Sequence, residues 1–249
     1  MNKLEIFPVK GFPEVTEGAD IGSLLLAAAR SSRLELRDGD AIVIKQKIVS
    51  KAEGRLVLLR RVKPSAKAKK LAGEQGKDPR LVELILREAV RVVRAGHGVI
   101  ITETRHGLVC ANSGVDRSNV SEGYAALLPV DPDASARRIR KGIEAVTGKK
   151  VAVIVSDTFG RPWRKGQTDV AIGCSGIDPL FSYRGKVDRY GYELRVTEPA
   201  VADELAGAAE LATGKLSRIP AAVVRGATFT RREVAIRSIA IEKEKDLFR

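Results

Sequence analysis

The stretch VAVIVSDTFGRPWRKGQTDVAIG, residues 151–173, joins a short apolar run to a dense group of polar and charged side chains. The run VAVIV is typical of a strand that is buried on both faces. It ends in two hydroxyls and a carboxylate, at Ser156, Asp157 and Thr158. Three cations then surround the only tryptophan of the chain, Trp163: they are Arg161, Arg164 and Lys165. We therefore expect a buried strand whose carboxyl end presents a cation-rich polar site.

The rest of the chain mixes strand and helix patterns without strict βαβ alternation. Strand patterns cover residues 3–9, the first half of 41–59 with its KQKIVSK segment, a hairpin over 98–114 that turns near Arg105–Gly107, and residues 219–226. Helix patterns cover residues 21–33, 64–75, 79–95, 131–148 and 199–212, and an amphipathic tail at 232–248. We find no repeat and no linker, so we expect one α+β domain over residues 1–249.

Composition limits the class of protein. The 249 residues are 44% hydrophobic and 30% charged, which is enough to bury one large domain or two packed lobes. No apolar run reaches the roughly 18 residues of a membrane span, and the N-terminus lacks the apolar segment of a secretory signal. Cys110 and Cys174 lie in apolar contexts without a CxxC pattern, so we expect buried thiols in the cytoplasm; a metal or redox pair is the alternative.

The net charge of +13, from 44 basic and 31 acidic residues, favours an anionic partner. Nucleic acid, phosphorylated metabolites and a polyacidic product all fit, and charge alone does not choose among them. The chain contains neither GxxxxGK[ST] nor GxGxxG, and His97 and His106 are not at zinc-ligand spacing.

Two segments place an aspartate after a predicted strand: LVCANSGVDRSN at 108–119 and VAVIVSDTFGR at 151–161. Carboxylate and hydroxyl oxygens are the ligands that Mg²⁺ and Mn²⁺ prefer. Nearby cations would then bind the phosphates that the metal bridges, and the candidates are Arg161, Arg164, Lys165, Lys45, Lys47 and Lys51. Each feature has a plainer interpretation: the aspartates as turn residues or helix caps, the cations as a solvated loop and a solvated strand face.

Six motifs resemble one known family almost from end to end. They are PVKGFP (8–13), IVSKAEGR (48–55), ANSGVDRSNV (111–120), LLPVDPD (127–133), SDTFGRPWRKGQTDVAIG (156–173) and PAAVVRG (220–226). The chain resembles the coenzyme F-420-0:L-glutamate ligases, the γ-glutamyl ligases of the deazaflavin coenzyme. GRPWRKGQTDVAIG looks closest to the bacterial form, which often carries a nitroreductase-like C-terminal domain; this sequence ends at Arg249, so we expect that domain to be absent.

The resemblance implies a two-lobed α+β fold and an intertwined homodimer. It also implies an enzyme that uses GTP and Mg²⁺ or Mn²⁺, with K⁺ as an additional candidate ion. The substrates would be L-glutamate and the lactyl carboxylate of the deazaflavin phosphodiester, activated as an acyl phosphate; further glutamates would follow through γ-linkages. Neither nucleic acid nor a membrane is expected as a partner.

The resemblance also assigns residues. Metal ligands would be Asp116, Asp157 and Thr158. Nucleotide-binding residues would be Phe12, Pro13, Glu14, Val15, Gln46, Lys47, Lys51, Asn119, Thr213, Gly214, Lys215, Leu216, Ser217, Arg218 and Ile219. We expect the catalytic residues to be Asp157, Lys51 and Arg161, the last from its charge alone.

One position departs from the family pattern. Archaeal members place a Glu or Gln, read as a metal ligand, where this chain has Lys215, and the loop is one residue shorter. A charged lysine cannot bind a cation, but it can replace a metal charge and contact phosphate directly. A second metal ion is therefore in doubt.

Two alternatives remain open. A related amide ligase acting on another phosphorylated carboxylate would carry the same motifs. A basic nucleic-acid-binding protein would fit the charge, although only 4% of the residues are aromatic and no helix-turn-helix pattern is present. Stabilisation by GTP with Mn²⁺ would distinguish an enzyme of this kind from a nucleic-acid binder.

Overall fold

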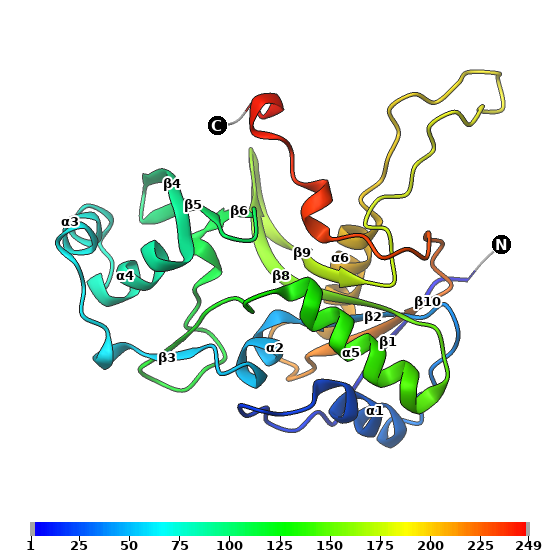
Figure 1. Ribbon diagram of the computed structural model, residues 1–249, viewed down its shortest axis with the longest axis horizontal. Helices are drawn as coiled ribbons and strands as arrows, with labels where there is room; N and C mark the ends of the chain where they lie inside the picture. Colours follow the sequence, from blue (N-terminus) through cyan, green and yellow to red (C-terminus); the bar gives the residue numbers. More distant parts are fainter. Residues whose placement is uncertain (1–2, 248–249) are drawn as a thin grey trace.

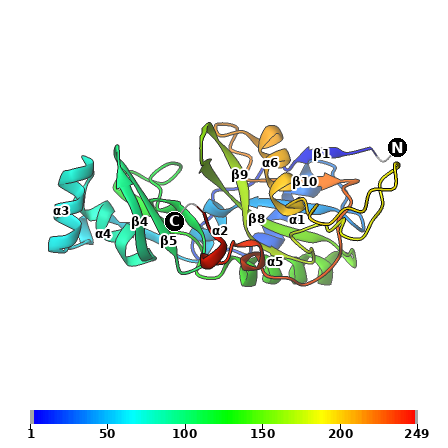
Figure 2. The ribbon, with the colours of Figure 1, turned by 90° about the horizontal axis from the view of Figure 1, so that it is seen from above.

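The computed structural model describes residues 3–247, and it shows a larger and a smaller lobe side by side (Figure 1). The elements of the larger lobe are β1 (Glu5–Pro8), α1 (Ile21–Ser31), β2 (Ala41–Lys45), α2 (Gln46–Ala52), α5 (Pro132–Thr147), β8 (Ala152–Arg161), β9 (Arg164–Ser175), α6 (Val201–Thr213) and β10 (Ala221–Arg225). The smaller lobe is built from residues 56–128 and lies at the far end of the long axis in both ribbon views (Figure 2). The predicted α+β class is confirmed.

The larger lobe is organised by one mixed sheet with the strand order β1-β10-β2-β8-β9. β2 runs parallel to β8, with Lys45 opposite Ser156, whereas β10 runs antiparallel to both of its neighbours, β1 and β2. The carboxyl ends of β1 and β2 therefore meet the amino end of β10 and the middle of β8 at a single edge of the sheet.

Helices cover both faces of this sheet because its strands alternate between two apolar sets. Ile42 and Ile44 face a core that includes residues of α1 and α5, while Ala41 and Val43 face a core that includes residues of α6. The start of α5 lies so close to β9 that a Cβ added at Gly173 would come within 2.4 Å of the Pro132 carbonyl carbon. Only glycine fits there.

The smaller lobe has its own core, in which Ile85 and Ile100 are fully buried. Its elements are β3 (Leu56–Leu58), η1 (Leu59–Arg61), α3 (Ala66–Gln75), α4 (Pro79–Glu88), β4 (Ala89–Gly96), β5 (Val99–Thr104), β6 (Val109–Ala111), η2 (Asn112–Gly114) and β7 (Tyr124–Ala126). The predicted hairpin over 98–114 is confirmed. The predicted helix over 79–95 is wrong in its second half: residues 89–96 pair with β5, and β-branched valines suit that pairing.

The prediction of a strand through KQKIVSK is also wrong. β2 ends at Lys45, and the next seven residues form α2. Lys45, Lys47 and Lys51 therefore do not line one strand face. Lys45 is the last residue of β2, whereas Lys47 and Lys51 lie on α2, so their side chains reach different parts of the same sheet edge.

Asp157 and Thr158 do not stand at the end of a strand as predicted. β8 continues to Arg161 and returns as β9, with Asp157 opposite Val170 and Thr158 opposite Asp169. The turn consists of Pro162 and Trp163, and Trp163 is 80% exposed with a φ of 57°. The cations that the sequence placed in a loop thus lie at the tip of a long hairpin.

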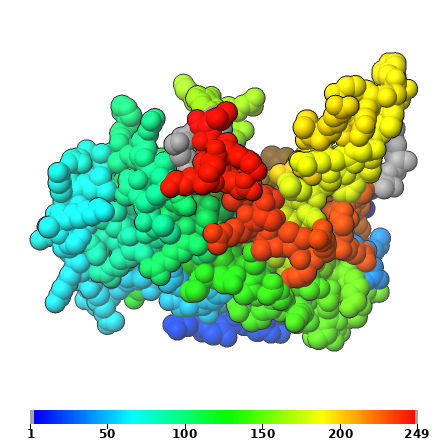
Figure 3. Space-filling model, turned by 45° about the horizontal axis from the view of Figure 1, so that its top comes forward, coloured from blue at the N-terminus to red at the C-terminus, as the bar shows by residue number. Residues whose placement is uncertain are grey.

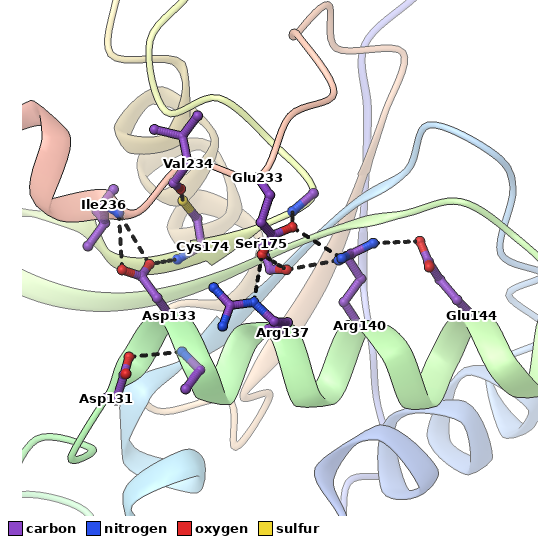
Figure 4. A network of polar contacts seen from close by, with 12 residues as sticks. Asp131, Asp133, Arg137, Arg140, Glu144, Cys174, Ser175, Glu233, Val234 and Ile236 are labelled. Atoms are coloured by element: carbon purple, nitrogen blue, oxygen red, sulfur yellow. Dashed lines mark hydrogen bonds and ion pairs between the residues drawn. The ribbon is translucent and has the colours of Figure 1, made fainter.

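The predicted amphipathic tail helix over 232–248 is wrong within the described residues, and Phe248 lies outside them. The tail is extended apart from η3 (Ile236–Ile239) and η4 (Lys243–Lys245). Figure 4 shows how it is fastened to α5 and β9: Glu233 accepts from Arg137, Arg140 and Ser175 Oγ, and Asp133 accepts from the backbone N–H of Cys174 and of Ile236. These side-chain contacts replace helix formation; we call this cluster the C-terminal clasp.

The other predicted elements are confirmed to within a few residues: strands at 3–9 and 219–226, and helices at 21–33, 64–75, 131–148 and 199–212. Between β9 and α6, residues 181–198 project from the body of the molecule (Figure 3).

No helix among residues 3–247 is long and apolar enough to cross a membrane. Cys110 and Cys174 are both buried thiols, and burial raises the pKa of each to about 12.

Candidate functional site

The shared edge of the five-stranded sheet brings together motif segments that are far apart in the sequence. The backbone N–H of Lys45 donates to the carbonyl of Pro220 at 2.8 Å, and Val9 N–H donates to Ala221 at 2.9 Å. Lys45 also lies opposite Ser156. The N-terminal loop, the start of α2, the β8–β9 hairpin and the loop before β10 therefore border one site.

The smaller lobe contributes Asp116 to this edge. Asp116 forms an isolated bridge with Ala126, which fixes its backbone, and its carboxylate accepts from Lys47 Nζ of α2 at 2.6 Å. Burial alone would raise the pKa of Asp116, but the hydrogen bonds from Lys47 and Ser118 outweigh it and lower that pKa. The site thus lies where the two lobes meet.

Asp157 is the unusual carboxylate of the site. Burial raises its pKa to about 6, and the charges of Asp116 and Asp169 add to the rise, although a hydrogen bond from the Thr158 backbone and the charge of Lys47 oppose it. It forms no salt bridge with any residue of the described range, whereas Asp116 and Asp169 each have a lysine partner. A shielded carboxylate of this kind is typical of a functional site.

Thr158 and Asp157 are neighbours on β8, so their side chains point to opposite faces of the hairpin. Val170, opposite Asp157, packs on the core beneath α1 and α5. Thr158 lies on the α6 side instead. Its Oγ1 donates to Asp169 at 2.6 Å and accepts from Lys215 Nζ. The structure therefore brings Asp157 towards Asp116, and Thr158 towards Lys215.

The N-terminal loop and α2 meet as the motifs imply. Lys51 Nζ forms an ion pair with Glu14, and Gly18 N–H donates to the carbonyl of Ala52 at 2.9 Å. Val15 is buried and Phe12 packs against the same core. Gln46 is turned inward, where its side chain accepts from Ser50 at 2.7 Å.

The loop from Thr213 to Ile219 joins α6 to β10 at the same edge. Thr213 is buried and donates to the Ala209 carbonyl, and Ser217 Oγ folds back onto Thr213. Leu216 is exposed, and Arg218 has a φ of 59°. Lys215 is the residue of this loop that reaches the hairpin.

Two predicted residues lie apart from these contacts. Asn119 is exposed, with a φ of 53°, in the loop that follows Asp116. Arg161 is exposed near the hairpin tip and donates to the Lys165 carbonyl at 3.1 Å.

Sequence reasoning missed Asp169 and Glu210. Asp169 accepts from Lys45, Ser156, Thr158 and Lys215, and Glu210 pairs with Lys45 and Lys215. The signal for Asp169 was its position inside GQTDVAIG, where a carboxylate interrupts an apolar strand. Glu210, in an alanine-rich helix, gave no comparable signal.

Residues 11–226 match the F420-0:Gamma-glutamyl ligase family. The chain belongs to this family. Proteins named coenzyme F420:L-glutamate ligase are similar to it over most of their length. The Methanothermobacter thermautotrophicus protein is 45% identical over 249 residues, 99% of each chain. The Methanopyrus kandleri protein is 48% identical over 224 residues, 90% of this chain and 87% of its own. The Methanocaldococcus jannaschii protein is 47% identical over 215 residues, 86% of each.

The residues of this γ-glutamyl ligase family member fit a divalent ion by their chemistry. Asp116 and Asp157 offer hard carboxylate oxygens, and Asp157 forms no salt bridge within residues 3–247, although the charge of Lys47 lies near it. Within residues 3–247, no three His, Cys, Asp or Glu side chains are gathered as a metal site. Mg²⁺ is commonly held by one or two carboxylates together with substrate phosphates, so two protein ligands suffice.

Proposed function

We propose that this chain is a GTP-dependent ligase that adds L-glutamate to the lactyl carboxylate of the deazaflavin phosphodiester and then extends the product through γ-linkages. Family membership supports the reaction class. The observation that carries the proposal is the proximity of Asp116 and Asp157, both beside Lys47, at an edge that lysines from two segments border: Lys47 and Lys51 of α2, and Lys215 of the loop between α6 and β10. Carboxylates for a metal beside cations for phosphates are what GTP-driven activation requires.

The first step would transfer the γ-phosphoryl group of GTP. A lactyl carboxylate oxygen attacks the γ-phosphorus, the bond to the β–γ bridging oxygen breaks, and GDP leaves. A divalent ion held by Asp116 and Asp157 would supply positive charge to the phosphate oxygens. Lys47 and Lys51 start from α2 beside the N-terminal loop, so they would orient the nucleotide phosphates.

The second step would form the amide. The glutamate amine attacks the acyl carbon, phosphate leaves with the bonding electrons, and the phosphate takes up the proton that the amine loses. Arg161, Arg164 and Lys165 at the exposed hairpin tip would attract the anionic phosphodiester and the carboxylates of incoming glutamate. The proposal includes a homodimer, Mg²⁺ or Mn²⁺ as the ion, and K⁺ as an additional ion.

Mass spectrometry tests the proposal. The purified chain is incubated with the glutamate-free deazaflavin phosphodiester, L-glutamate, GTP and Mn²⁺, and the products are weighed. We expect masses that increase by glutamyl units, with GDP and phosphate released in equal amounts.

Two variants make the test specific. Asp157→Asn should give no glutamylated product, whereas Asp38→Asn, the same substitution near the amino end of β2, should behave as the unmodified chain. GTP binding without glutamylation would indicate an amide ligase for another carboxylate. If the chain neither bound GTP nor formed a glutamylated product, the proposal of a GTP-dependent ligase would be refuted.

A further inference from the structure

The α6 side of the β8–β9 hairpin carries a closed group of charges that involves four elements of the chain. Asp169, only 1% exposed, accepts from Thr158 Oγ1 at 2.6 Å, Ser156 Oγ at 3.1 Å and Lys215 Nζ at 3.3 Å, and from Lys45. Glu210 of α6 pairs with Lys45 and lies 3.4 Å from Lys215 Nζ. We call Lys45, Asp169, Glu210 and Lys215 the α6-side quartet.

The quartet is electrically balanced, because its two ammonium groups face two carboxylates. Burial alone would raise the pKa of Asp169, but hydrogen bonds from Lys45 and Thr158 lower it, so the carboxylate stays charged. On the opposite side of the hairpin, Asp116 and Asp157 share a single neighbouring lysine, Lys47. Among these residues, all within 3–247, carboxylates therefore outnumber lysines only on the Asp157 side.

The two lysines of the quartet differ in access. The Lys45 side chain is 18% exposed and bound at its tip by Asp169 and Glu210. The Lys215 side chain is 51% exposed and starts from the loop between α6 and β10, with its ammonium among three oxygens: Thr158 Oγ1, Asp169 Oδ1 and Glu210 Oε1. Such an oxygen set would suit a cation, and the lysine already provides one.

We propose that Asp169 and Glu210 hold Lys215 as a tethered cation for phosphate oxygens, so that the α6 side of the hairpin takes no divalent ion. The chain then binds one divalent ion per site, on the Asp116 and Asp157 side. Asp169 is a positioning residue: it acts on ligands through Lys215 and Thr158. This inference rests on the proposed function, since it assumes that a nucleotide with a metal binds at this edge.

Counting bound Mn²⁺ tests the inference without any turnover. Metal-free chain with saturating GDP is titrated with MnCl₂, and free Mn²⁺ is measured by electron paramagnetic resonance. We expect one tightly bound Mn²⁺ per chain. Lys215→Gln removes the ammonium and leaves two carboxylates against Lys45, so we expect two Mn²⁺ per chain and GDP affinity at least about tenfold weaker.

A double variant separates charge from folding. Glu210→Gln added to Lys215→Gln restores the balance between Lys45 and Asp169, so the count should return to one while thermal unfolding stays cooperative. Lys186→Gln, on the projecting segment 181–198, should change neither count nor GDP affinity.

The outcomes distinguish this inference from the function on which it rests. Two Mn²⁺ per unmodified chain, or an unchanged count of one in Lys215→Gln, would overturn the tethered cation while leaving the ligase intact. No bound Mn²⁺ in the unmodified chain, even with GDP, would overturn both.

Discussion

The C-terminal clasp and the candidate site both gather carboxylates and cations on the same sheet, but they leave them in different states. In the clasp, Glu233 accepts from two arginines, a serine and the Gly176 N–H; burial alone would raise its pKa, but these contacts lower it. At the site, Asp157 has no ion-pair partner among residues 3–247, and its pKa rises to about 6. Glu233, whose partners are protein groups of the clasp, serves the fold, whereas Asp157, which forms no ion pair within residues 3–247, is available to a ligand.

The energetic reason is desolvation. Taking a carboxylate out of water is costly unless hydrogen bonds or opposite charges replace the lost hydration. The clasp supplies these from α5 and β9, so it secures an extended tail that forms no long helix. Around Asp157 the cost remains in the metal-free protein, and a divalent ion would offset it.

The largest expected effect comes from Asp157→Asn, which removes the carboxylate without an ion pair in the described range that distinguishes the candidate site from the C-terminal clasp. Mn²⁺ affinity should fall at least about 100-fold, or roughly 3 kcal/mol, because one of two carboxylate ligands is lost. Isothermal titration with Mn²⁺ and GDP measures the change. Retained affinity would show that Asp157 is not a ligand.

Glu233→Ala tests the clasp. It leaves Arg140 with Glu144 as its remaining carboxylate partner and frees the tail, so the free energy of unfolding should fall by about 2 kcal/mol. For a chain of this size that corresponds to a Tm lower by about 4–8 °C. Mn²⁺ affinity should stay within about twofold, and a large loss would mean that the clasp and the site are coupled.

The pKa of Asp157 predicts a smaller, opposite effect of Asp157→Asn on the metal-free protein. A carboxyl whose pKa is higher in the folded than in the unfolded state destabilises the fold as pH rises from about 4 to 6, because the unfolded chain loses its proton first. Removing it should raise the free energy of unfolding by about 1–3 kcal/mol at pH 8 and leave it unchanged at about pH 3, where the carboxyl is protonated in both states.

Denaturant unfolding of both chains with chelator, at the two pH values, provides the measurement. Destabilisation at pH 8 would contradict the interpretation that Asp157 is a half-buried charge without an ion-pair partner among the described residues. Asp38→Asn is the matched control, and its difference from the unmodified chain should not follow this pattern.

The smallest expected effect is that of Arg161→Ala at the exposed hairpin tip. An exposed cation contributes about 1 kcal/mol to binding an anion, so KM for the phosphodiester should rise about fivefold with kcat nearly unchanged. Arg60→Ala, an exposed arginine of the smaller lobe, should leave both constants unchanged. A large drop in kcat would instead place Arg161 in the chemical step.

Local patterns predicted most elements of the fold but failed where tertiary pairing decides. The valines of 89–96 have helix-compatible spacing, yet they pair with β5. KQKIVSK alternates like a strand, yet the chain turns into α2 after Lys45. The tail has an amphipathic pattern, yet contacts with Asp133 and Glu233 hold it extended. Pairing with β5 outweighed the helical spacing of residues 89–96, and contacts with α5 and β9 outweighed the amphipathic pattern of the tail.

The sequence by itself determined the α+β class, the buried strand at VAVIV, and the residue types that mark Asp116 and Asp157 as candidates, because apolar periodicity and hard-oxygen chemistry are local properties. Only the tertiary structure decided that β8 continues past Asp157 into a hairpin, that Asp157 lies on the Asp116 side of it and Thr158 on the α6 side, and that Asp169 and Glu210 contact Lys215 there. Which side a residue faces depends on strand register, and which charges meet depends on the order of strands in the sheet. Neither can be predicted from the local sequence alone.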